Sequence, residues 1–282
     1  MKTNVAELKV LSPRSIEEAL QQRRDVPNLT PIAGGTEVLV WLNDGKFAGK
    51  NYQSLHGLAK DWRYVRANAD GTLSIGALAT YSDVRFHAVV KEKYPLLVES
   101  ARVTGALQIQ NRGTPAGNIA NGSPAADTVP SLMVYDAKLK LASVRGERVV
   151  ELKDFFTGYR KNVMGADELI SEIILPAPLF SAHQQHYRKV GTREAQAISK
   201  VVFAGARGAA GVRLAWGSLA PTTIRAHKTE AAIQNGADAN AAWEILQTEI
   251  APIDDIRSTA EYRRKVTRNI LHEFMGRVPA GK

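Results

Sequence analysis

The sequence contains no cysteine among its 282 residues. This absence excludes disulfide bonds, zinc sites with cysteine ligands and protein-bound iron–sulfur clusters from the chain itself. No apolar run approaches the roughly 20 residues that a membrane-spanning helix needs. The N-terminal segment MKTNVAELKVL also lacks the apolar centre of a signal peptide. We therefore expect a cytoplasmic protein with no membrane span.

Two common nucleotide-binding fingerprints are missing as well. The chain has no Gly-x-Gly-x-x-Gly motif and no loop that ends in the Gly-Lys-Ser/Thr of a Walker A sequence. We also identify no metal site and no acid–base pair that would have to act in catalysis. A nicotinamide fingerprint or a P-loop therefore has no support in this sequence.

A concentrated basic surface is not evident either, although the net charge is +9, from 37 lysines and arginines against 28 acidic residues. The densest basic cluster, EYRRKVTR at 261–268, would be spread around the surface of a helix. A nucleic-acid-binding protein concentrates such charge on one face. We therefore expect no nucleic-acid partner, and we interpret the charge as a solvated surface or one that docks onto an acidic partner.

The composition of the chain is that of a globular protein with a sizeable core, since 44% of its residues are hydrophobic and 23% are charged. In the first half, strand-like and helix-like segments alternate. The patterns predict strands over 6–11, 29–33 and 169–175, hairpins over 62–77 and 136–152, and helices over 12–22, 37–45 and 80–107. The hairpin turns are expected at Asp70-Gly71 and near Arg145-Gly146, and the last helical run should break before Pro95.

A domain boundary is expected at LPAPLFSAHQQ, residues 175–185, where two prolines and a polar run follow the strand-like LISEIIL. Beyond it, ISKVVFAGARGAAGVRLAWGSLA predicts a long hairpin across 208–211. Three helical segments follow, around 225–235, 239–250 and 259–276. The chain is therefore predicted to be α+β, with a larger N-terminal unit and a smaller C-terminal unit.

Two glycine-rich segments are permissive enough for backbone to approach a ligand closely. The first segment, PIAGGTEVLV at 31–40, is predicted to be a strand, a Gly-Gly-Thr turn and a helix. Backbone amides exposed at such a turn suit phosphate oxygens. Taken alone, however, a Gly-Gly-Thr turn is a weak signal, and the segment is better interpreted as a plain tight turn.

The second segment, NRGTPAGNIANGSPAADTVPS at 111–131, has no apolar period of 2 or 3.6, so we expect neither an ordinary strand nor an ordinary helix. Its glycines and asparagines can bring backbone amides inward, and Thr114, Ser123 and Asp127 offer two hydroxyls and a carboxylate. An irregular surface loop is the alternative interpretation. The interleaved Ile109 and Ile119 favour a packed loop instead, and long structured loops in compact domains are usually functional.

Together, AGGTEVLV and the later QIQNRGTPAGNIANGSPAADTVPSLMVYDAKLKLAS resemble the flavin-binding subunits of the molybdenum hydroxylases. That family includes xanthine dehydrogenases, aerobic carbon monoxide dehydrogenases and related oxidoreductases of aldehydes and N-heterocycles. The resemblance continues through DFFTGYRKNVMGADELISEIILP, YRKVGTREAQAISKV and LAWGSLAPTTIRA, so it covers nearly the whole chain. In SPAADTVPSLMVYDAKLKLASVRGERVV it is closest to bacterial xanthine dehydrogenase flavin subunits.

The resemblance implies a two-part FAD-binding domain of the vanillyl-alcohol-oxidase (PCMH) type over residues 1–177. It implies a smaller α+β domain of the carbon monoxide dehydrogenase flavoprotein type, an antiparallel sheet plus helices, over residues 183–282. FAD would lie extended across the first domain, with its pyrophosphate between the two glycine-rich segments. The cofactor should be bound non-covalently, because the chain has no cysteine and the first loop has no adjacent histidine.

The resemblance also implies the cofactor-binding residues, position by position. They are Ile32, Ala33, Gly34, Gly35, Thr36, Glu37 and Val38 in the first segment, and Ile109, Thr114, Gly117, Asn118, Asn121, Ser123 and Asp127 in the second. Leu169 or Ile170 would pack near the ring system. Lys189 matches a lysine beside the flavin, where a cation would favour the anionic reduced form by charge attraction.

One departure from the family pattern falls in the second segment, where Thr-x-Gly-Gly-Asn is replaced by Thr114-Pro115-Ala116-Gly117-Asn118. Pro115 has no amide hydrogen to donate, and Ala116 disfavours a positive φ. We therefore expect one backbone contact to the cofactor to be missing or re-routed.

The function that the resemblance implies is electron transfer within a multi-subunit molybdenum hydroxylase that oxidises a purine, an N-heterocycle or an aldehyde. The molybdenum cofactor and the [2Fe–2S] clusters would lie only on a large and a small partner subunit, and a dimer of heterotrimers is the expected assembly. The external acceptor could be NAD+, O2 or a quinone. Two alternatives stay open: a self-sufficient flavoenzyme of the same fold, and an adaptor subunit that has lost its flavin.

Overall fold

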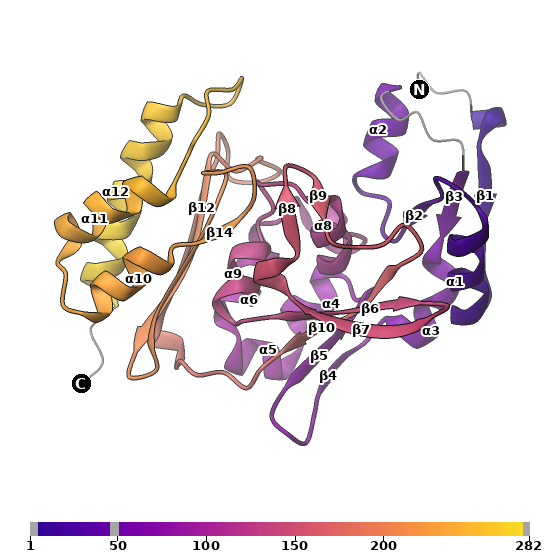
Figure 1. The fold of residues 1–282 in the computed structure, drawn as a ribbon, viewed down its shortest axis with the longest axis horizontal. Coiled ribbons are helices and arrows are strands. Elements are labelled where there is room, and N and C mark those ends of the chain that lie inside the picture. The colour runs from indigo at the N-terminus through magenta and orange to yellow at the C-terminus, as the bar shows by residue number, and fades with distance from the viewer. Residues whose placement is uncertain (1–4, 46–50, 279–282) are drawn as a thin grey trace.

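A computed structural model describes residues 5–45 and 51–278 of the chain. Within these residues the strands form sheets of three, five, four and two strands. Figure 1 shows the three-stranded sheet at one end of the molecule, the five-stranded sheet with its helices in the middle and the four-stranded sheet with three helices at the other end.

The three-stranded sheet is parallel and presents the first glycine-rich segment. It consists of β1 (Lys9–Leu11), β2 (Thr30–Ile32) and β3 (Asn51–Ser54), in the order β1-β3-β2. Parallel neighbours need crossover connections. The helix α1 (Ile16–Asp25) lies between β1 and β2, and α2 (Val38–Asp44) follows β2. Residues 33–37 therefore leave the carboxyl end of β2.

The five-stranded sheet is antiparallel and carries most of the larger core. Its order is β4 (Val65–Ala67), β5 (Leu73–Gly76), β10 (Leu169–Leu175), β6 (Lys138–Ser143) and β7 (Gly146–Glu151). Buried side chains of these strands, such as Leu139 and Ile173, share one hydrophobic cluster with Val84 and Leu97. The helices that join this cluster are α4 (Tyr81–Phe86), α5 (Ala88–Lys93), α6 (Pro95–Val103) and α9 (Val129–Val134).

The C-terminal sheet is packed on both faces. Its order is β11 (Gln185–Val190), β12 (Val201–Gly208), β13 (Gly211–Gly217) and β14 (Ile224–Arg225), all antiparallel. The pair Phe203–Trp216 belongs to a core with the three C-terminal helices, whereas the adjacent pair Ala204–Ala215 belongs to the core of the larger domain. Because side chains alternate along a strand, one strand pair serves two cores.

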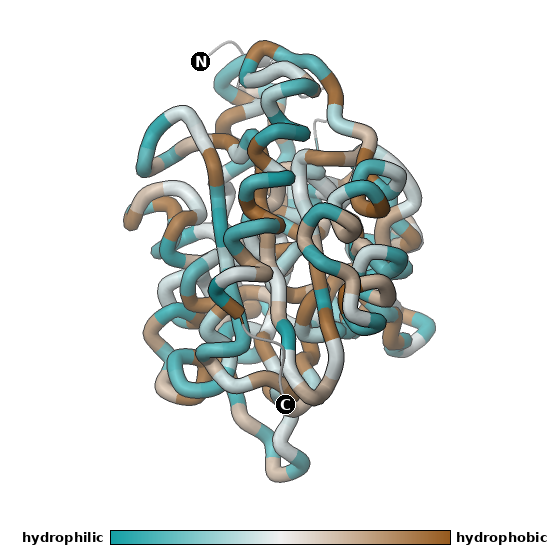
Figure 2. The backbone as a smooth tube through the Cα atoms, turned by 90° about the vertical axis from the view of Figure 1, so that its left-hand side faces the viewer, coloured by the Kyte–Doolittle hydropathy of each residue, from teal (hydrophilic) through white to brown (hydrophobic). Residues whose placement is uncertain are grey.

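The three C-terminal helices are α10 (His227–Gln234), α11 (Ala239–Glu249) and α12 (Ala260–Arg277). They cover the outer face of the four-stranded sheet (Figure 1), with Phe274 of α12 against Phe203 at 5.3 Å between ring centroids. Figure 2 looks onto these helices and shows hydrophilic and hydrophobic residues alternating along them, as expected of helices that bury one face.

The predicted hairpins, the strands within 6–11, 29–33 and 169–175, and the predicted helices are confirmed, with shifts of a few residues at their ends. The expectation for 111–131 is wrong in part, since α8 (Pro115–Asn121) and the start of α9 lie there. The 80–107 run has a second break at His87 and ends in the short α7 (Leu107–Gln110). Elements that the pattern missed include α3 (Ala59–Trp62), β3, β8 (Phe156–Gly158), β9 (Lys161–Asn162), β11 and β14.

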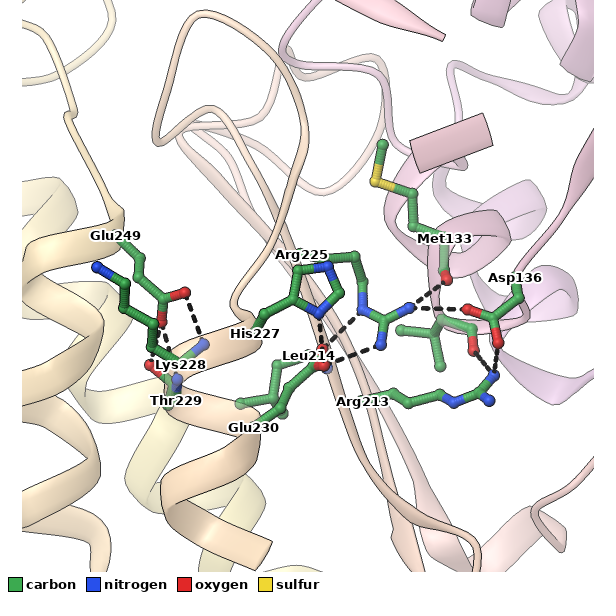
Figure 3. Close-up of polar contacts among 11 residues, drawn as sticks. Met133, Asp136, Arg213, Leu214, Arg225, His227, Lys228, Thr229, Glu230 and Glu249 are labelled. Atoms are coloured by element: carbon green, nitrogen blue, oxygen red, sulfur yellow. Dashed lines mark hydrogen bonds and ion pairs between the residues drawn. The ribbon is translucent and has the colours of Figure 1, made fainter. Parts of the chain in front are cut away.

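A buried ion-pair network joins the end of α9 to the C-terminal sheet (Figure 3). The Arg225 side chain, 8% exposed, donates to both carboxylate oxygens of Glu230, at 2.6 and 2.9 Å. It also donates to the Met133 carbonyl and to Asp136, each at 2.9 Å. Arg213 pairs with the same Asp136. One guanidinium thus ties the two halves of the molecule together.

We expect Arg225→Met to lower the free energy of unfolding by ~3 kcal/mol, because it leaves the buried Glu230 carboxylate without its counter-charge. Urea unfolding measures the loss. Arg145→Ala is the control, since Arg145 pairs with Asp167 while 66% exposed, and such exposed pairs contribute less than about 1 kcal/mol. A loss for Arg225→Met no greater than that of the control would contradict the assignment.

Candidate functional site: two glycine-rich segments that meet

The first segment is built for close backbone contact. Gly35 has φ +76°, which an L side chain rarely adopts. A Cβ on Gly34 would lie 1.8 Å from the carbonyl oxygen of Arg112, in the second segment. Thr36 lies near the same place, since a Cβ on Gly113 would be 3.3 Å from the Thr36 hydroxyl. The structure therefore brings the two predicted segments together, and their backbones touch with no side chain between Gly34 and the Arg112 carbonyl.

The second segment begins with a capped helix rather than an irregular loop. Thr114 is the N-cap of α8, and its hydroxyl accepts a hydrogen bond from the Gly117 amide at 3.0 Å. Gly122 ends the helix with φ +64°. Asn118 Oδ1 accepts a hydrogen bond from the Thr128 hydroxyl at 3.0 Å, which ties α8 to the start of α9. The two helix caps and this hydrogen bond therefore stabilise a stretch whose sequence has no apolar period.

The departure at Pro115 and Ala116 falls in the first turn of α8. Pro115 lies at the start of the helix, where an amide hydrogen would have no partner within the helix and where proline is favoured. Ala116 is buried in the helix and is not among the residues with positive φ. The expected conflict with a positive φ is therefore wrong. The two residues are compatible with the local backbone, and the helix loses nothing by them.

A small hollow of about 50 Å³ opens where the two segments meet. Ala33 and Gly34 line it from the first segment, and Asn111, Arg112 and Thr114 line it from the second. The rest of its lining is His56, Ala59, Arg63, Leu78 and Thr80. Arg63 pairs with Asp83 at 2.8 Å, whereas the Arg112 side chain has no acidic partner within the described residues. The lining of the hollow therefore includes two threonine hydroxyl groups, glycine backbone and an arginine that has no acidic partner in the described part of the chain.

Several other predicted residues flank the hollow without lining it. Glu37 precedes α2 and pairs with Arg160 at 3.5 Å. The Ser123 hydroxyl accepts from the Ala125 amide at 3.2 Å, which shapes the turn after α8. Ile109 packs against Gly105, where a Cβ would be 2.6 Å away. Gly35, Thr36, Val38, Gly117, Asn118 and Asn121 lie in the loop or in α2 and α8 beside it, and Ile32 ends β2.

Asp127 and Lys189 are paired with each other. The Lys189 ammonium lies 2.6 Å from Asp127 Oδ2, and both side chains are about nine-tenths buried. Lys189 also donates to the Val103 carbonyl at 2.8 Å, and the Ser199 hydroxyl donates to the second carboxylate oxygen of Asp127. Tyr187 donates to the Asp127 carbonyl at 3.1 Å. This cluster joins the second segment to β11 and to the turn before β12.

Burial raises the pKa of the Asp127 carboxyl above its usual value, while the Lys189 ammonium and the Ser199 hydroxyl act in the opposite direction. Burial also raises the pKa of Tyr187, which stays a neutral donor. The ion pair is therefore held in a dry environment, where a charge is strongly felt by any group placed next to it.

Leu169 and Ile170 are buried at the start of β10, at 3% and 6% exposure, where the register with β6 shifts. Neither lines the hollow. Sequence reasoning missed Arg112, His56 and Arg63, because these exposed polar side chains lie in a turn, in a 3-10 helix and just beyond a helix end, where no apolar pattern marks them. It also missed Ser199 as the second partner of Asp127, although Ser199 lies in the YRKVGTREAQAISKV stretch that carried the resemblance.

Two observations limit the chemistry of the described residues, 5–45 and 51–278. They contain no group of three or more histidine, aspartate or glutamate side chains arranged to hold a metal ion. None of their helices is both long enough and apolar enough to cross a membrane.

Two family models match the chain and together span most of it. The FAD binding domain in molybdopterin dehydrogenase matches residues 6–178. The CO dehydrogenase flavoprotein C-terminal domain matches residues 186–278. The fold is thus that of a flavoprotein with an FAD-binding domain followed by a small α+β domain.

Relatives and solved structures define the family further. The xanthine dehydrogenase FAD-binding subunit of Escherichia coli O157:H7 is 30% identical over 273 residues, which are 92% of this chain and 93% of that protein. The nicotinate dehydrogenase FAD-subunit of Eubacterium barkeri is 35% identical over 197 residues, 67% and 65% of the two chains. The chain therefore belongs to the FAD-binding subunits of the molybdenum hydroxylases.

The solved structures agree in fold. A chain of carbon monoxide dehydrogenase from Hydrogenophaga pseudoflava superposes with a TM-score of 0.89 at 24% identity, covering 96% of both chains. A chain of quinoline 2-oxidoreductase from Pseudomonas putida 86 gives a TM-score of 0.88 at 21% identity, covering 99% and 98%. The two-domain FAD-binding fold predicted from the sequence is confirmed.

Gly34→Ala should separate the two segments, because the new methyl group would meet the Arg112 carbonyl. We expect at least a tenfold loss of FAD affinity, measured by quenching of flavin fluorescence. Gly276→Ala is the matched control, since a Cβ there meets nothing within 4 Å in α12. Equal FAD affinity of Gly34→Ala and the control would show that the close contact does not matter.

Lys189→Met should leave Asp127 buried without its cation and lower the free energy of unfolding by ~3 kcal/mol. Asp127→Asn combined with Lys189→Met should recover much of that loss, because no buried charge is then unpaired. Denaturant unfolding of the flavin-free chains tests this pair. A double variant no more stable than Lys189→Met would rule out charge pairing as the cause.

Proposed function

We propose that this chain is the electron-transferring flavin subunit of a molybdenum hydroxylase, accepting electrons from a [2Fe–2S] partner and passing them to an external acceptor. The observation that carries the proposal is the meeting of the two glycine-rich segments around one hollow. Family membership supports FAD as the group that this site holds.

The residues present fit the pyrophosphate of FAD. Two negative charges call for backbone amides, hydroxyls and a cation. The segments supply Thr36 and Thr114 as hydroxyls and Arg112 as a cation, which has no acidic partner among residues 5–45 and 51–278. The glycines keep the approach open. In the proposed site Ala33, Gly34, Gly35, Thr36 and Glu37 hold one side of the pyrophosphate, and Thr114, Gly117, Asn118, Asn121 and Ser123 hold the other.

The hollow is much smaller than a dinucleotide, so it would receive only part of the cofactor. The flavin ring is proposed to lie toward the seam between the domains, near Leu169, Ile170 and the Asp127–Lys189 pair. The Lys189 ammonium, held in place by Asp127 and by the Val103 carbonyl, would then favour negative charge on a neighbouring group. Its fixed position requires no reorganisation when charge develops.

When bound, FAD is the electron carrier that links donors and acceptors of different kinds. The role of this chain's residues is to bind and orient that carrier and to set the charge around it. No side chain of the site is assigned a proton transfer.

The rest of the proposal concerns assembly and partners. We propose a domain boundary between residues 177 and 183, in the segment between β10 and β11. A large subunit with the molybdenum cofactor and a small subunit with [2Fe–2S] clusters would complete the enzyme as a dimer of heterotrimers. The names of the relatives, which include xanthine dehydrogenase, nicotinate dehydrogenase and glyceraldehyde dehydrogenase, support a purine, an N-heterocycle or an aldehyde as the substrate. NAD+, O2 or a quinone would be the acceptor.

The natively purified chain should show flavin absorption bands, and acid precipitation should release them into the supernatant because the cofactor is non-covalent. Combining Thr36→Ala with Asn118→Ala should cut flavin retention several-fold. The absorbance ratio of flavin to protein measures both. Arg145→Ala, at a residue that does not line the hollow, should retain flavin like the wild type.

A colourless chain that also fails to take up added FAD would contradict the proposal and favour a flavin-free adaptor. Flavin bands that stay with the precipitate would contradict non-covalent binding. Co-purification of partner subunits would distinguish the proposed subunit from a self-sufficient flavoenzyme of the same fold.

A further inference from the structure

The segment Gly158-Tyr159-Arg160-Lys161 belongs to neither glycine-rich segment, yet it reaches both. It forms the turn between β8 and β9. Arg160 has φ +53°, a left-handed conformation that is uncommon and costly for a residue with a Cβ. Strained backbone of this kind persists only where the surroundings hold it, and it is concentrated at functional sites.

On one side, Arg160 packs against the middle of the second segment, where Gly122 ends α8. A Cβ on Gly122 would lie 3.1 Å from Arg160 Cα, and Gly122 itself has φ +64°. Two left-handed residues therefore face each other across this contact. A side chain at position 122 would push the turn and α8 apart.

On the other side, the Arg160 side chain reaches α2, which follows the first segment directly. Its guanidinium lies 3.5 Å from Glu37 Oε1, and its Cζ lies 4.8 Å from the ring centroid of Trp41. Only Leu42 is buried among the residues of α2, and Figure 1 shows this helix standing apart from the neighbouring elements. A contact that reaches α2 from outside, in addition to those that Trp41, Leu42 and Asp44 make, therefore helps to fix the position of this helix.

We propose that Arg160 is a positioning residue that holds α2, and with it the first segment, against the second segment, so that the FAD site stays assembled. This inference rests on the proposed function of the site. Arg160 acts through Glu37, Trp41 and Gly122, and no contact of its own with the cofactor is required.

The chemistry of the contact calls for arginine rather than lysine. The planar guanidinium can stack on an indole and pair with a carboxylate at the same time, which an ammonium group does less well. The Arg160 and Glu37 side chains are 37% and 44% exposed, so their ion pair alone would contribute little. The positioning of α2 therefore depends on one residue, Arg160, contacting Glu37, Trp41 and Gly122 at the same time.

The test compares FAD binding with folding in the full chain. Arg160→Ala should raise the FAD Kd about tenfold, equivalent to about 1.4 kcal/mol, and should speed FAD release on dilution. Arg160→Lys, which keeps the charge, should recover part of the affinity. Arg145→Ala, which removes an arginine from another exposed ion pair, should bind FAD within twofold of the wild type.

Arg160→Gly separates positioning from stability. Glycine adopts φ +53° without strain, so the free energy of unfolding without FAD should not fall, while the FAD Kd should rise as it does in Arg160→Ala. FAD binding within twofold of the wild type in both variants would overturn the assigned role and leave the proposed function standing. A wild-type chain that binds no FAD would overturn both.

Discussion

The contact between Gly34 and the Arg112 carbonyl is the constraint on which the rest of the site depends. Two segments almost eighty residues apart in sequence approach so closely that no side chain fits between them. The parallel sheet fixes one segment at the end of β2, and the caps of α8 fix the other. The hollow, with its threonine hydroxyl groups and the Arg112 side chain, forms only because these two backbones meet.

Buried charge has a different role at the seam between the domains. Asp127 and Lys189 join the second segment to β11, and Arg225 with Glu230 and Asp136 joins α9 to the C-terminal sheet. Since α9 begins within the second segment, both pairs control the same stretch of chain. Such pairs stabilise less than an equivalent apolar contact, but each admits only one geometry.

The sequence was informative where structure is set locally. The hairpin turns at Asp70-Gly71 and Arg145-Gly146 and the long C-terminal helix follow from turn chemistry and apolar period. In contrast, α8 has no apolar period, and it is stabilised by the Thr114 cap and by proline at its start. A prediction based on the spacing of apolar residues does not take these two signals into account. The pairing of Asp127 with Lys189 spans 62 residues, and no local pattern encodes such a distance. The resemblance to a known family indicated both residues but not their contact.

The division of β12 and β13 between two cores has a consequence for how this chain can evolve. Phe203 and Trp216 face the C-terminal helices, while Ala204 and Ala215 face the larger domain. Small side chains on that face let α9 approach the sheet, so the inner surface of one domain is shaped for the other. Recombination at the linker would exchange a sequence segment but not a complete core. The two domains are therefore expected to be inherited together, as one unit of selection.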